Sequence, residues 1–289
     1  MNGAGSRPDR YALIGHPVSH SWSPFIHGMF ARQAQQNLQY RLIDADALQF
    51  RASALGFLVE GGRGLNVTVP HKQAAAEFVN ELTPRALVAG AVNTISRKAD
   101  GELLGDNTDG VGLVIDLSDN LKLSLAGKRV LVLGAGGATR GVLGPLLALR
   151  PALVAIANRT VERATQLAAT FTGHGTLSVS GFEGVEPAPF DLVLNATSAS
   201  LAGTVPQVPS AVIGRETVCY DMAYAPGETP FTQWALAQGA SAAHKGWGML
   251  VEQAAESFLV WRGVRPSTHA VLELLKAKGR ESVSPGTSP

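Results

Sequence analysis

The chain has 289 residues and a mass of 30.2 kDa, enough for one or two domains of about 150 residues each. Apolar residues make up 45% of it and charged residues only 16%, which favours a globular protein with a real core over a disordered one. The formal net charge is +1, so neither a nucleic-acid partner nor an anionic membrane surface is indicated.

Cysteine content and hydropathy indicate the compartment. Cys219 is the single cysteine, which excludes a disulfide framework or a thiolate metal cluster and fits a reducing environment. The segment Met1–Arg10 is polar and lacks the apolar core of a signal peptide. No uninterrupted apolar run reaches the ~20 residues of a membrane helix, because Arg150 and Pro151 divide the richest stretch. We therefore expect a soluble, cytoplasmic protein that does not contact a membrane.

The first 110 residues alternate short aliphatic runs with longer helical ones, which is typical of an α/β domain. The expected strands are Tyr11–Gly15, Gln39–Ile43, Leu65–Val69, Val92–Ser96 and Glu102–Leu104. The expected helices are Pro24–Gln35, Ala47–Val59 and Lys72–Glu81. This order predicts a mainly parallel sheet covered by helices. The terminal segments 1–9 and 281–289 are rich in Gly, Ser and Pro, and we expect both to be disordered.

A second α/β series begins near Gly127, after a helical connector expected over Val111–Leu121. Its expected strands are Lys128–Leu133, Ala152–Ala157, Leu192–Asn195, Val218–Asp221 and Ser241–His244, and its expected helices are Ala138–Ala148 and Val161–Phe171. A last helix, Met249–Trp261, carries apolar residues at spacings of three and four, and from the pattern alone it could pack on either domain.

The strongest local motif is Gly134-Ala135-Gly136-Gly137-Ala138-Thr139, which follows an expected strand and opens an expected helix. Glycines at such a turn let the backbone approach a pyrophosphate, and the amino end of the helix supplies unpaired N–H groups. The motif departs from G-x-G-x-x-G because Thr139 occupies its third glycine position. The alternative is an ordinary tight strand-to-helix turn, but the strand–turn–helix–strand context favours a Rossmann-like nucleotide-binding domain.

The tip of the next strand indicates which dinucleotide is bound. NAD-binding folds place an acidic residue there for the ribose 2′-hydroxyl, whereas this chain has Asn158-Arg159-Thr160 and, one turn later, Arg163. Arginine can pair with a 2′-phosphate, so NADP is favoured over NAD. The plain alternative is a solvated helix start capped by Thr160.

Four polar clusters in the first half could carry the chemistry, because they lie at or after strand ends, where open parallel sheets bind ligands. They are Gly15–Pro24, Asn66–Lys72, Gly90–Thr94 and Gly105–Gly110. Each also has a purely structural explanation: Ser23 before Pro24 could be a helix N-cap, Lys72 a solvated lysine at a helix start, and Asp109 an N-cap.

Taken in order, these segments resemble the NADP-dependent shikimate dehydrogenase family over about residues 10–277. The matched strings include H-S-x-S-P at His20–Pro24, N-V-T-V-P-H-K at Asn66–Lys72, G-A-V-N-T at Gly90–Thr94 and G-D-N-T-D-G at Gly105–Gly110. The glycine turn, N-R-T at Asn158–Thr160, N-A-T-S at Asn195–Ser198 and G-M-L-V-x-Q at Gly248–Gln253 follow. Eight matches in family order make the resemblance specific, although no single one would.

The resemblance implies reversible, NADP-linked interconversion of 3-dehydroshikimate and shikimate by a two-domain enzyme. The substrate domain would comprise 10–110 completed by 246–279, with the last helix returning to it, and the Rossmann-like domain 111–245. Lys72 and Asp109 would form the catalytic pair. Substrate contacts would come from Ser21 and Ser23 to the carboxylate, and from Asn66, Thr68, Asn93, Tyr224 and Gln253. Cofactor contacts would come from Gly134, Ala135, Gly136, Gly137, Ala138, Asn158, Arg159, Thr160, Arg163, Thr197, Ser198, Met222, Gly246 and Met249.

The chemistry agrees with this assignment, since reducing a ketone needs a hydride from nicotinamide and a proton for the oxygen. Lys72 could deliver that proton if Asp109 orients it. The histidines His16, His20, His27 and His71 match no tight ligand spacing, so we expect no metal site. Two departures from the family pattern fall on the cofactor side: Ser200 stands near an expected glycine, and Lys245 stands where an acidic or polar residue is common.

Several alternatives stay open. The enzyme could oxidise quinate or use NAD, although Ser21/Ser23 and Arg159/Arg163 favour shikimate and NADP. A folate-linked methylene dehydrogenase shares the two-domain plan with a catalytic lysine, but Gly105–Gly110 and Gly248–Gln253 do not suit it. A non-catalytic NADP-sensing regulator on the same fold would be expected to have lost Lys72 or Asp109. A homodimer is an open option for the assembly.

Overall fold

The computed structural model describes residues 7–225 and 227–281, with the side chains of 279–281 left aside. The chain divides into two compact units, which are described separately: the first holds the residues up to Gly112 and Val251–Val271, the second Leu113–Leu250 and the chain from Leu272 onward. No helix in the described ranges is long and apolar enough to cross a membrane.

The expectation of disordered tails falls mostly on residues 1–6 and 282–289, which lie outside the described residues. For Asp9 and Glu281 it is wrong, because Asp9 opens a strand and Glu281 closes a helix. Asp9 is fixed by its carboxylate, which accepts from Arg262 Nη1 at 2.5 Å and from Arg63 Nε at 3.2 Å.

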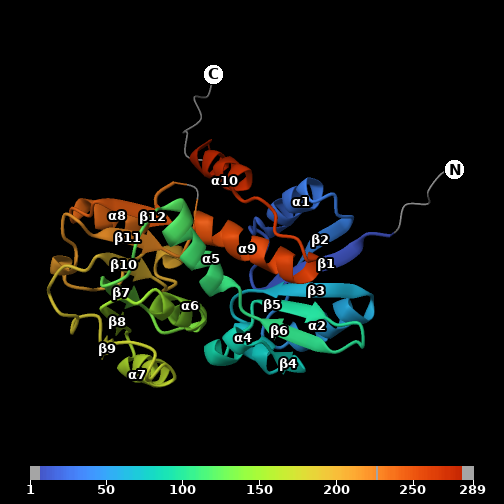
Figure 1. Cartoon of the computed structure of the whole chain (residues 1–289), viewed down its shortest axis with the longest axis horizontal. Coiled ribbons are helices and arrows are strands. Elements are labelled where there is room, and N and C mark those ends of the chain that lie inside the picture. The colour runs from blue at the N-terminus through green and yellow to red at the C-terminus, as the bar shows by residue number, and fades with distance from the viewer. Residues whose placement is uncertain (1–6, 226, 282–289) are drawn as a thin grey trace. The chain divides into compact units, whose positions relative to one another are not determined.

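The first unit is built on a six-stranded sheet in the order β2-β1-β3-β5-β6-β4 (Figure 1). Its strands are β1 (Asp9–Gly15), β2 (Leu38–Asp44), β3 (Gly62–Val67), β4 (Glu81–Leu82), β5 (Thr94–Arg97) and β6 (Leu103–Asp106). Its helices are α1 (Ser23–Gln33), α2 (Phe50–Val59), α3 (Lys72–Ala76) and α4 (Pro84–Ala89). The core of this unit joins Ala12 and Ile14 of β1 to Phe50 and Phe57 of α2 and to Leu65 of β3.

This sheet is mainly parallel, as expected, but it contains one antiparallel strand. Strand β5 runs antiparallel to both β3 and β6, while β1 is parallel to its neighbours β2 and β3, and β4 is parallel to β6. Only the short turn Lys98–Glu102 separates β5 from β6, and a turn of that length joins antiparallel strands, whereas a parallel pair needs a crossover of a dozen or more residues.

The helix expected over Lys72–Glu81 is also shorter than predicted. Helix α3 ends at Ala76, and Glu81 and Leu82 instead pair with Leu104 and Gly105 of β6. Side-chain Oδ1 of Asn80 accepts from the Leu103 backbone N–H at 2.9 Å, which starts this pairing. The alanine-rich segment itself stays helical, and the residues after it leave the helix to reach the edge of the sheet.

The second unit contains an all-parallel sheet in the order β12-β11-β10-β7-β8-β9 (Figure 1). Its strands are β7 (Arg129–Leu133), β8 (Leu153–Ala157), β9 (Leu177–Ser180), β10 (Leu192–Asn195), β11 (Val218–Asp221) and β12 (Ala242–Lys245). This is the strand order of the doubly wound dinucleotide fold, and its topological switch point lies between β7 and β10. Separate apolar clusters bury the alternate residues of β7, with Val130 and Val132 in one and Leu131 and Leu133 in the other.

Helices and short turns complete the second unit. They are α5 (Asp109–Ile115), shared with the first unit, a π-helix over Asp116–Asn120, α6 (Gly137–Ala148), α7 (Val161–Ala169), 3₁₀ turns at Ser200–Ala202 and Ser210–Val212, α8 (Pro230–Ala237), α9 (Trp247–Arg262) and α10 (His269–Glu281). Pattern reading missed β9, α8 and α10. Helix α8 had a local signal, because Thr229 and Thr232 form a capping box just before and after Pro230.

Helix α9 behaves as the family resemblance implied, since its residues from Val251 onward belong to the first unit. A Cβ placed on Gly112 of α5 would lie 2.6 Å from the backbone nitrogen of Gln253 on α9. These two helices therefore pack backbone to backbone, and only glycine fits at that position.

Candidate active site

Most of the predicted substrate and catalytic residues lie at one edge of the first sheet, the edge formed by the ends of its strands. Strands β1, β3 and β6 end at this edge, and the antiparallel β5 begins there. The loops after β1 and β3, the start of β5 and the loop after β6 supply Ser21, Thr68, Asn93 and Asp109 in turn. Four segments separated by as many as 88 positions in sequence are thus brought to one edge by the strand order alone.

Lys72 and Asp109 form a direct ion pair. Lys72 Nζ lies 2.5 Å from Asp109 Oδ2, and the two side chains are only 20% and 6% exposed. Lys72 is the first residue of α3, yet its side chain is partly buried and paired. The interpretation of Lys72 as a solvated lysine is therefore wrong.

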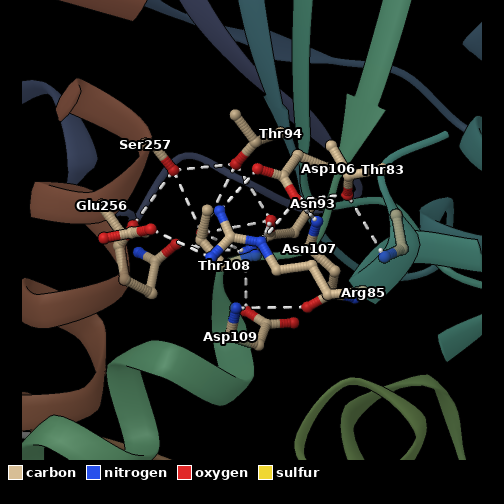
Figure 2. Close-up of polar contacts among 12 residues, drawn as sticks. Thr83, Arg85, Asn93, Thr94, Asp106, Asn107, Thr108, Asp109, Glu256 and Ser257 are labelled. Carbon is tan, nitrogen blue, oxygen red and sulfur yellow. Dashed lines mark hydrogen bonds and ion pairs between the residues drawn. The ribbon is translucent and has the colours of Figure 1, made fainter. Parts of the chain in front are cut away.

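Asn93 fixes the other oxygen of this carboxylate. Its Nδ2 donates to Asp109 Oδ1 at 2.8 Å and lies 3.3 Å from Gln253 Oε1 on α9. Its Oδ1 accepts from the Thr108 backbone N–H at 2.8 Å (Figure 2). With one oxygen held by Lys72 and the other by Asn93, the Asp109 carboxylate has little rotational freedom.

A second layer of polar residues lies behind Asn93, and most of it was not predicted. Asn66 Nδ2 lies 3.0–3.2 Å from three oxygens, those of Ser257 Oγ, Thr94 Oγ1 and the Asn93 carbonyl, while Asn66 Oδ1 accepts from Tyr40 OH at 2.7 Å. Ser257 and Thr94 are fully buried. Ser257 could have been found from its position one helical turn after Gln253, but Tyr40 carries no local signal.

The two serines of the first loop lie next to each other. Ser21 Oγ donates to Ser23 Oγ at 3.1 Å and accepts from the Ser23 backbone N–H at 3.2 Å. Ser23 is not the N-cap of α1: Trp22 holds that position without a capping side chain, and Ser23 is the first helical residue. Thr68, from the loop after β3, is half-buried.

Three histidines of the first unit, His16, His27 and His71, contact other residues of the protein through their rings. His16 Nδ1 lies 2.5 Å from Asp44 Oδ1, and His71 Nε2 lies 2.7 Å from the Ala45 carbonyl. His27 is fully buried and stacks on Tyr40 with ring centroids 4.3 Å apart, and neither ring nitrogen reaches a hydrogen-bond partner within the described residues. Burial lowers the pKa of His27 to about 3. Among the described residues no group of three His, Cys, Asp or Glu side chains could hold a metal ion.

In the second unit the glycine turn lies at the switch point of the parallel sheet. Gly134 has φ +108° and lies against the chain after β10, where an added Cβ would be 3.1 Å from Thr197 Cγ2. Gly136 and Gly137 have no atom within 4 Å of an added Cβ, and Gly136 caps α6 without a side-chain hydrogen bond. The first turn of α6 therefore presents backbone N–H groups to open space, which fits a dinucleotide phosphate.

The tip of β8 lies beside this turn. Asn158 Oδ1 accepts from the Ala135 backbone N–H at 3.2 Å, and Asn158 Nδ2 donates to the Thr160 carbonyl at 2.7 Å. Arg159 and Arg163 are exposed. Thr160 is the N-cap of α7 but forms no side-chain cap, so its interpretation as a side-chain helix cap is wrong.

The ends of β10 and β11 are joined by a buried carboxylate. Asp221 accepts from Ser200 Oγ at 2.5 Å, Thr229 Oγ1 at 2.6 Å and Asn195 Nδ2 at 3.0 Å. Burial raises the pKa of Asp221, while the Ser200 and Thr229 donors act against that rise. Ser200, the first departure from the family pattern, therefore satisfies a buried carboxylate.

Lys245, the second departure, closes the same region. Its Nζ donates to the Gly227 carbonyl and lies 3.7 Å from Glu228 Oε1. This holds the segment after β11, in which the Tyr224 ring packs on Trp247 at 4.9 Å.

The remaining residues predicted to contact the cofactor also lie in the second unit. The Met222 backbone N–H donates to the Asn195 carbonyl at 2.9 Å, and that of Gly246 to the Ala223 carbonyl at 3.1 Å. The Met249 backbone N–H lies 3.3 Å from Tyr220 OH. Thr197, Ser198, Met222, Gly246 and Met249 thus gather around the ends of β10, β11 and β12, on the switch-point side of the sheet.

Fold and site together define a class. The second unit has the doubly wound fold of dinucleotide-binding domains, and the first unit carries a partly buried Lys–Asp ion pair. This combination is typical of two-domain oxidoreductases that use a nicotinamide cofactor.

Comparisons with known proteins identify the family. The family described as shikimate dehydrogenase substrate binding domain matches residues 13–95, shikimate / quinate 5-dehydrogenase matches 116–209, and shikimate 5′-dehydrogenase C-terminal domain matches 246–276. The chain belongs to the shikimate dehydrogenase family.

Relatives are similar over nearly their whole length. The shikimate dehydrogenase (NADP(+)) of Aeromonas hydrophila is 54% identical, over 93% of this chain and 97% of that protein. The protein of the same name from Methylococcus capsulatus is 50% identical, over 95% and 99%. The crystal structure of shikimate 5-dehydrogenase from Thermus thermophilus in complex with NADP(H) and shikimate is 31% identical with a TM-score of 0.81, covering 93% of this chain and 99% of that one.

Proposed function

We propose that this chain is an NADP-dependent shikimate dehydrogenase that reversibly reduces 3-dehydroshikimate to shikimate, a step in aromatic amino-acid biosynthesis. The observation that carries the assignment is the Lys72–Asp109 pair at the strand edge of a chain about half identical to proteins named shikimate dehydrogenase (NADP(+)). The non-catalytic regulator is not supported, because both Lys72 and Asp109 are present and paired. The folate-linked dehydrogenase is not supported, because the shikimate dehydrogenase family models match residues 13–95, 116–209 and 246–276.

The geometry of the Lys72–Asp109 pair supports the following catalytic step. Bound NADPH supplies the hydride for the ketone carbon. Lys72 Nζ holds the proton that the ketone oxygen takes up, and in the oxidative direction it receives the proton of the hydroxyl. Asp109 Oδ2 at 2.5 Å orients the ammonium group, and Asn93 holds the second carboxylate oxygen so that Asp109 keeps facing Lys72. Asp109 also balances the positive charge in a site where little water screens it.

The substrate contacts are proposed from the residues gathered at the same edge. The hydroxyls of Ser21 and Ser23 are adjacent, so both could donate to one carboxylate if the Ser21 hydroxyl turned away from Ser23 Oγ, to which it donates in this structure. The Thr68 hydroxyl makes no hydrogen bond to any described residue, which leaves it available to a ring hydroxyl. Asn66, Asn93 and Gln253 of the first unit are the other proposed contacts at this edge. Tyr224, in the second unit, stays a predicted contact to the carboxylate end.

For the cofactor, the open first turn of α6 would hold the pyrophosphate, and the exposed Arg159 and Arg163 would pair with the 2′-phosphate. Asn158 and Thr160 would shape that tip, and Thr197, Ser198, Met222, Gly246 and Met249 would surround the nicotinamide half. We also propose functional domains at 10–110 with 246–279 and at 111–245. A cytoplasmic location and association into a homodimer stay predictions.

Quinate is the second candidate substrate, because the family matching residues 116–209 is described as shikimate / quinate 5-dehydrogenase. The deciding experiment is an assay of the purified protein with shikimate or quinate and NADP or NAD, followed by the absorbance of reduced nicotinamide. We expect shikimate with NADP to give the highest kcat/KM of the four combinations. Equal or better turnover of quinate, or of NAD, would overturn the corresponding part of the assignment.

A further inference from the structure

Arg85, on α4, joins two other elements through its guanidinium group. Its Nε and Nη2 donate to the two oxygens of Asp106, at the end of β6, at 2.6 and 2.5 Å. Its third nitrogen, Nη1, donates to Glu256 Oε1 on α9 at 2.9 Å (Figure 2). All three nitrogens of the planar group are therefore used, in an arrangement that lysine cannot reproduce.

The Asp106 arm leads directly to the catalytic loop. The Asp106 side chain is 5% exposed, and its Oδ1 also accepts from Thr83 Oγ1 at 2.6 Å and from the Asn107 backbone N–H at 2.7 Å. Asn107 Oδ1 in turn accepts from the Asp109 backbone N–H at 3.2 Å. A carboxylate fixed by Arg85 thus sets the turn from which Asp109 projects.

The charge state of this arm is well determined. Burial would raise the pKa of Asp106, but donation from Arg85 and Thr83 outweighs it and holds that pKa below its ordinary value. The pKa of Arg85 is raised by its hydrogen bonds to Asp106. Both groups are charged at neutral pH, so the paired hydrogen bonds from the Arg85 guanidinium to the Asp106 carboxylate are intact under assay conditions.

The Glu256 arm leads to the part of α9 that faces the same site. Glu256 Oε2 accepts from Arg265 Nη1 at 2.8 Å, and Arg265 Nη2 donates at 2.8 Å to Glu252, whose side chain is 3% exposed. Glu252 immediately precedes Gln253. This alternating chain of charges holds the helical turn that presents Gln253.

We propose that Arg85 is a positioning residue that sets the catalytic loop through Asp106 and the substrate-binding turn of α9 through Glu256. The inference rests on the proposed function, because Asp109 and Gln253 have their roles only there. The three guanidinium nitrogens of Arg85 donate to Asp106 and Glu256, so its effect is transmitted through two separable contacts.

The two arms predict different kinetic changes. Asp106→Asn should lower kcat about 10- to 100-fold with KM for shikimate within about threefold, because misplacing a catalytic group by 1 Å can cost about a hundredfold. Glu256→Gln should raise KM about three- to tenfold with kcat nearly unchanged, because it loosens a residue that binds ground state and transition state alike. Arg85→Gln should show both changes, and Arg85→Lys, which keeps the charge but not the fork, should recover only part of either.

Arg63→Gln is the matched control, since Arg63 also pairs with an aspartate, Asp9, but is 63% exposed and belongs to no part of the site. It should leave kcat and KM unchanged. Every variant is assayed below its measured unfolding temperature, so that a loss of fold is not read as a loss of catalysis.

Wild-type kcat and KM in folded Arg85→Gln would overturn the proposal, as would a set of variants that differ only in unfolding temperature. If Arg85→Gln does not fold, Asp106→Asn and Glu256→Gln decide, and wild-type constants in both would overturn it. Failure of the proposed function gives another pattern: the wild-type protein would not turn over shikimate, or Lys72→Ala would turn it over fully.

Discussion

Lowering the pH should destabilise this protein through His27, and the size of the effect follows from its burial. The folded protein keeps His27 neutral because burial lowers its pKa to about 3, whereas the unfolded chain binds a proton near pH 6.5. Between these values the unfolded state holds more protons, so the free energy of unfolding falls as pH falls. At pH 5 an unfolded-state pKa of about 6.5 gives a loss of about 2 kcal/mol relative to pH 8.

The test compares urea unfolding of wild type and His27→Phe at pH 8 and pH 5. Phenylalanine keeps a ring against Tyr40 and cannot be protonated. From pH 8 to pH 5 the free energy of unfolding should therefore fall by about 2 kcal/mol less in the variant than in wild type. His20→Gln, at an exposed histidine on the neighbouring loop, serves as control and should follow wild type. Identical pH dependence in wild type and His27→Phe would refute the reasoning.

Three further predictions concern activity. Lys72→Ala and Asp109→Asn should each lower kcat by about 10²–10⁴-fold, and kcat of the double variant should be little lower than that of the worse single variant, because the effects of residues in one catalytic unit are not additive. Steady-state kinetics with a shikimate binding titration test this prediction. Full turnover in Lys72→Ala would refute the mechanism. Arg159→Ala should weaken NADP about ten- to a hundredfold while barely affecting NAD, since the lost contact is to the 2′-phosphate; equal losses measured by cofactor titration would instead give Arg159 a role in the fold. Ser21→Ala and Ser23→Ala should mainly raise KM for shikimate, and unchanged KM in both would remove the carboxylate assignment.

The features that could be predicted from the sequence are those that depend on residues close together in the chain. The strands at Leu192–Asn195 and Val218–Asp221 were predicted to the residue, because short, largely apolar runs are typical of strands that a parallel sheet buries on both faces. The glycine turn was recognisable because strand, turn and helix are consecutive in the chain.

What could not be predicted depends on contacts between distant segments. The antiparallel direction of β5 is set by its pairing with β3 and β6, which no hydropathy pattern records. Tyr40 and Arg85 lie 26 and 21 positions from their partners Asn66 and Asp106, so only the fold brings them together. The same limit hid the role of Ser200. It departs from the family pattern, and only the structure shows its hydrogen bond to Asp221.

The side chains of the polar layer behind Asn93 use their hydrogen-bonding groups within the protein, and this affects which positions can change when substrate choice changes. The buried hydroxyls of Thr94 and Ser257 bond to each other and to Asn66, so replacing either hydroxyl leaves a buried polar atom unpaired and lowers the free energy of unfolding. The half-buried Thr68 belongs to no such network, so a new side chain there would alter the proposed substrate contact without leaving a buried polar atom unpaired. Substitutions that change substrate choice are therefore expected at Thr68 rather than in the polar layer behind Asn93.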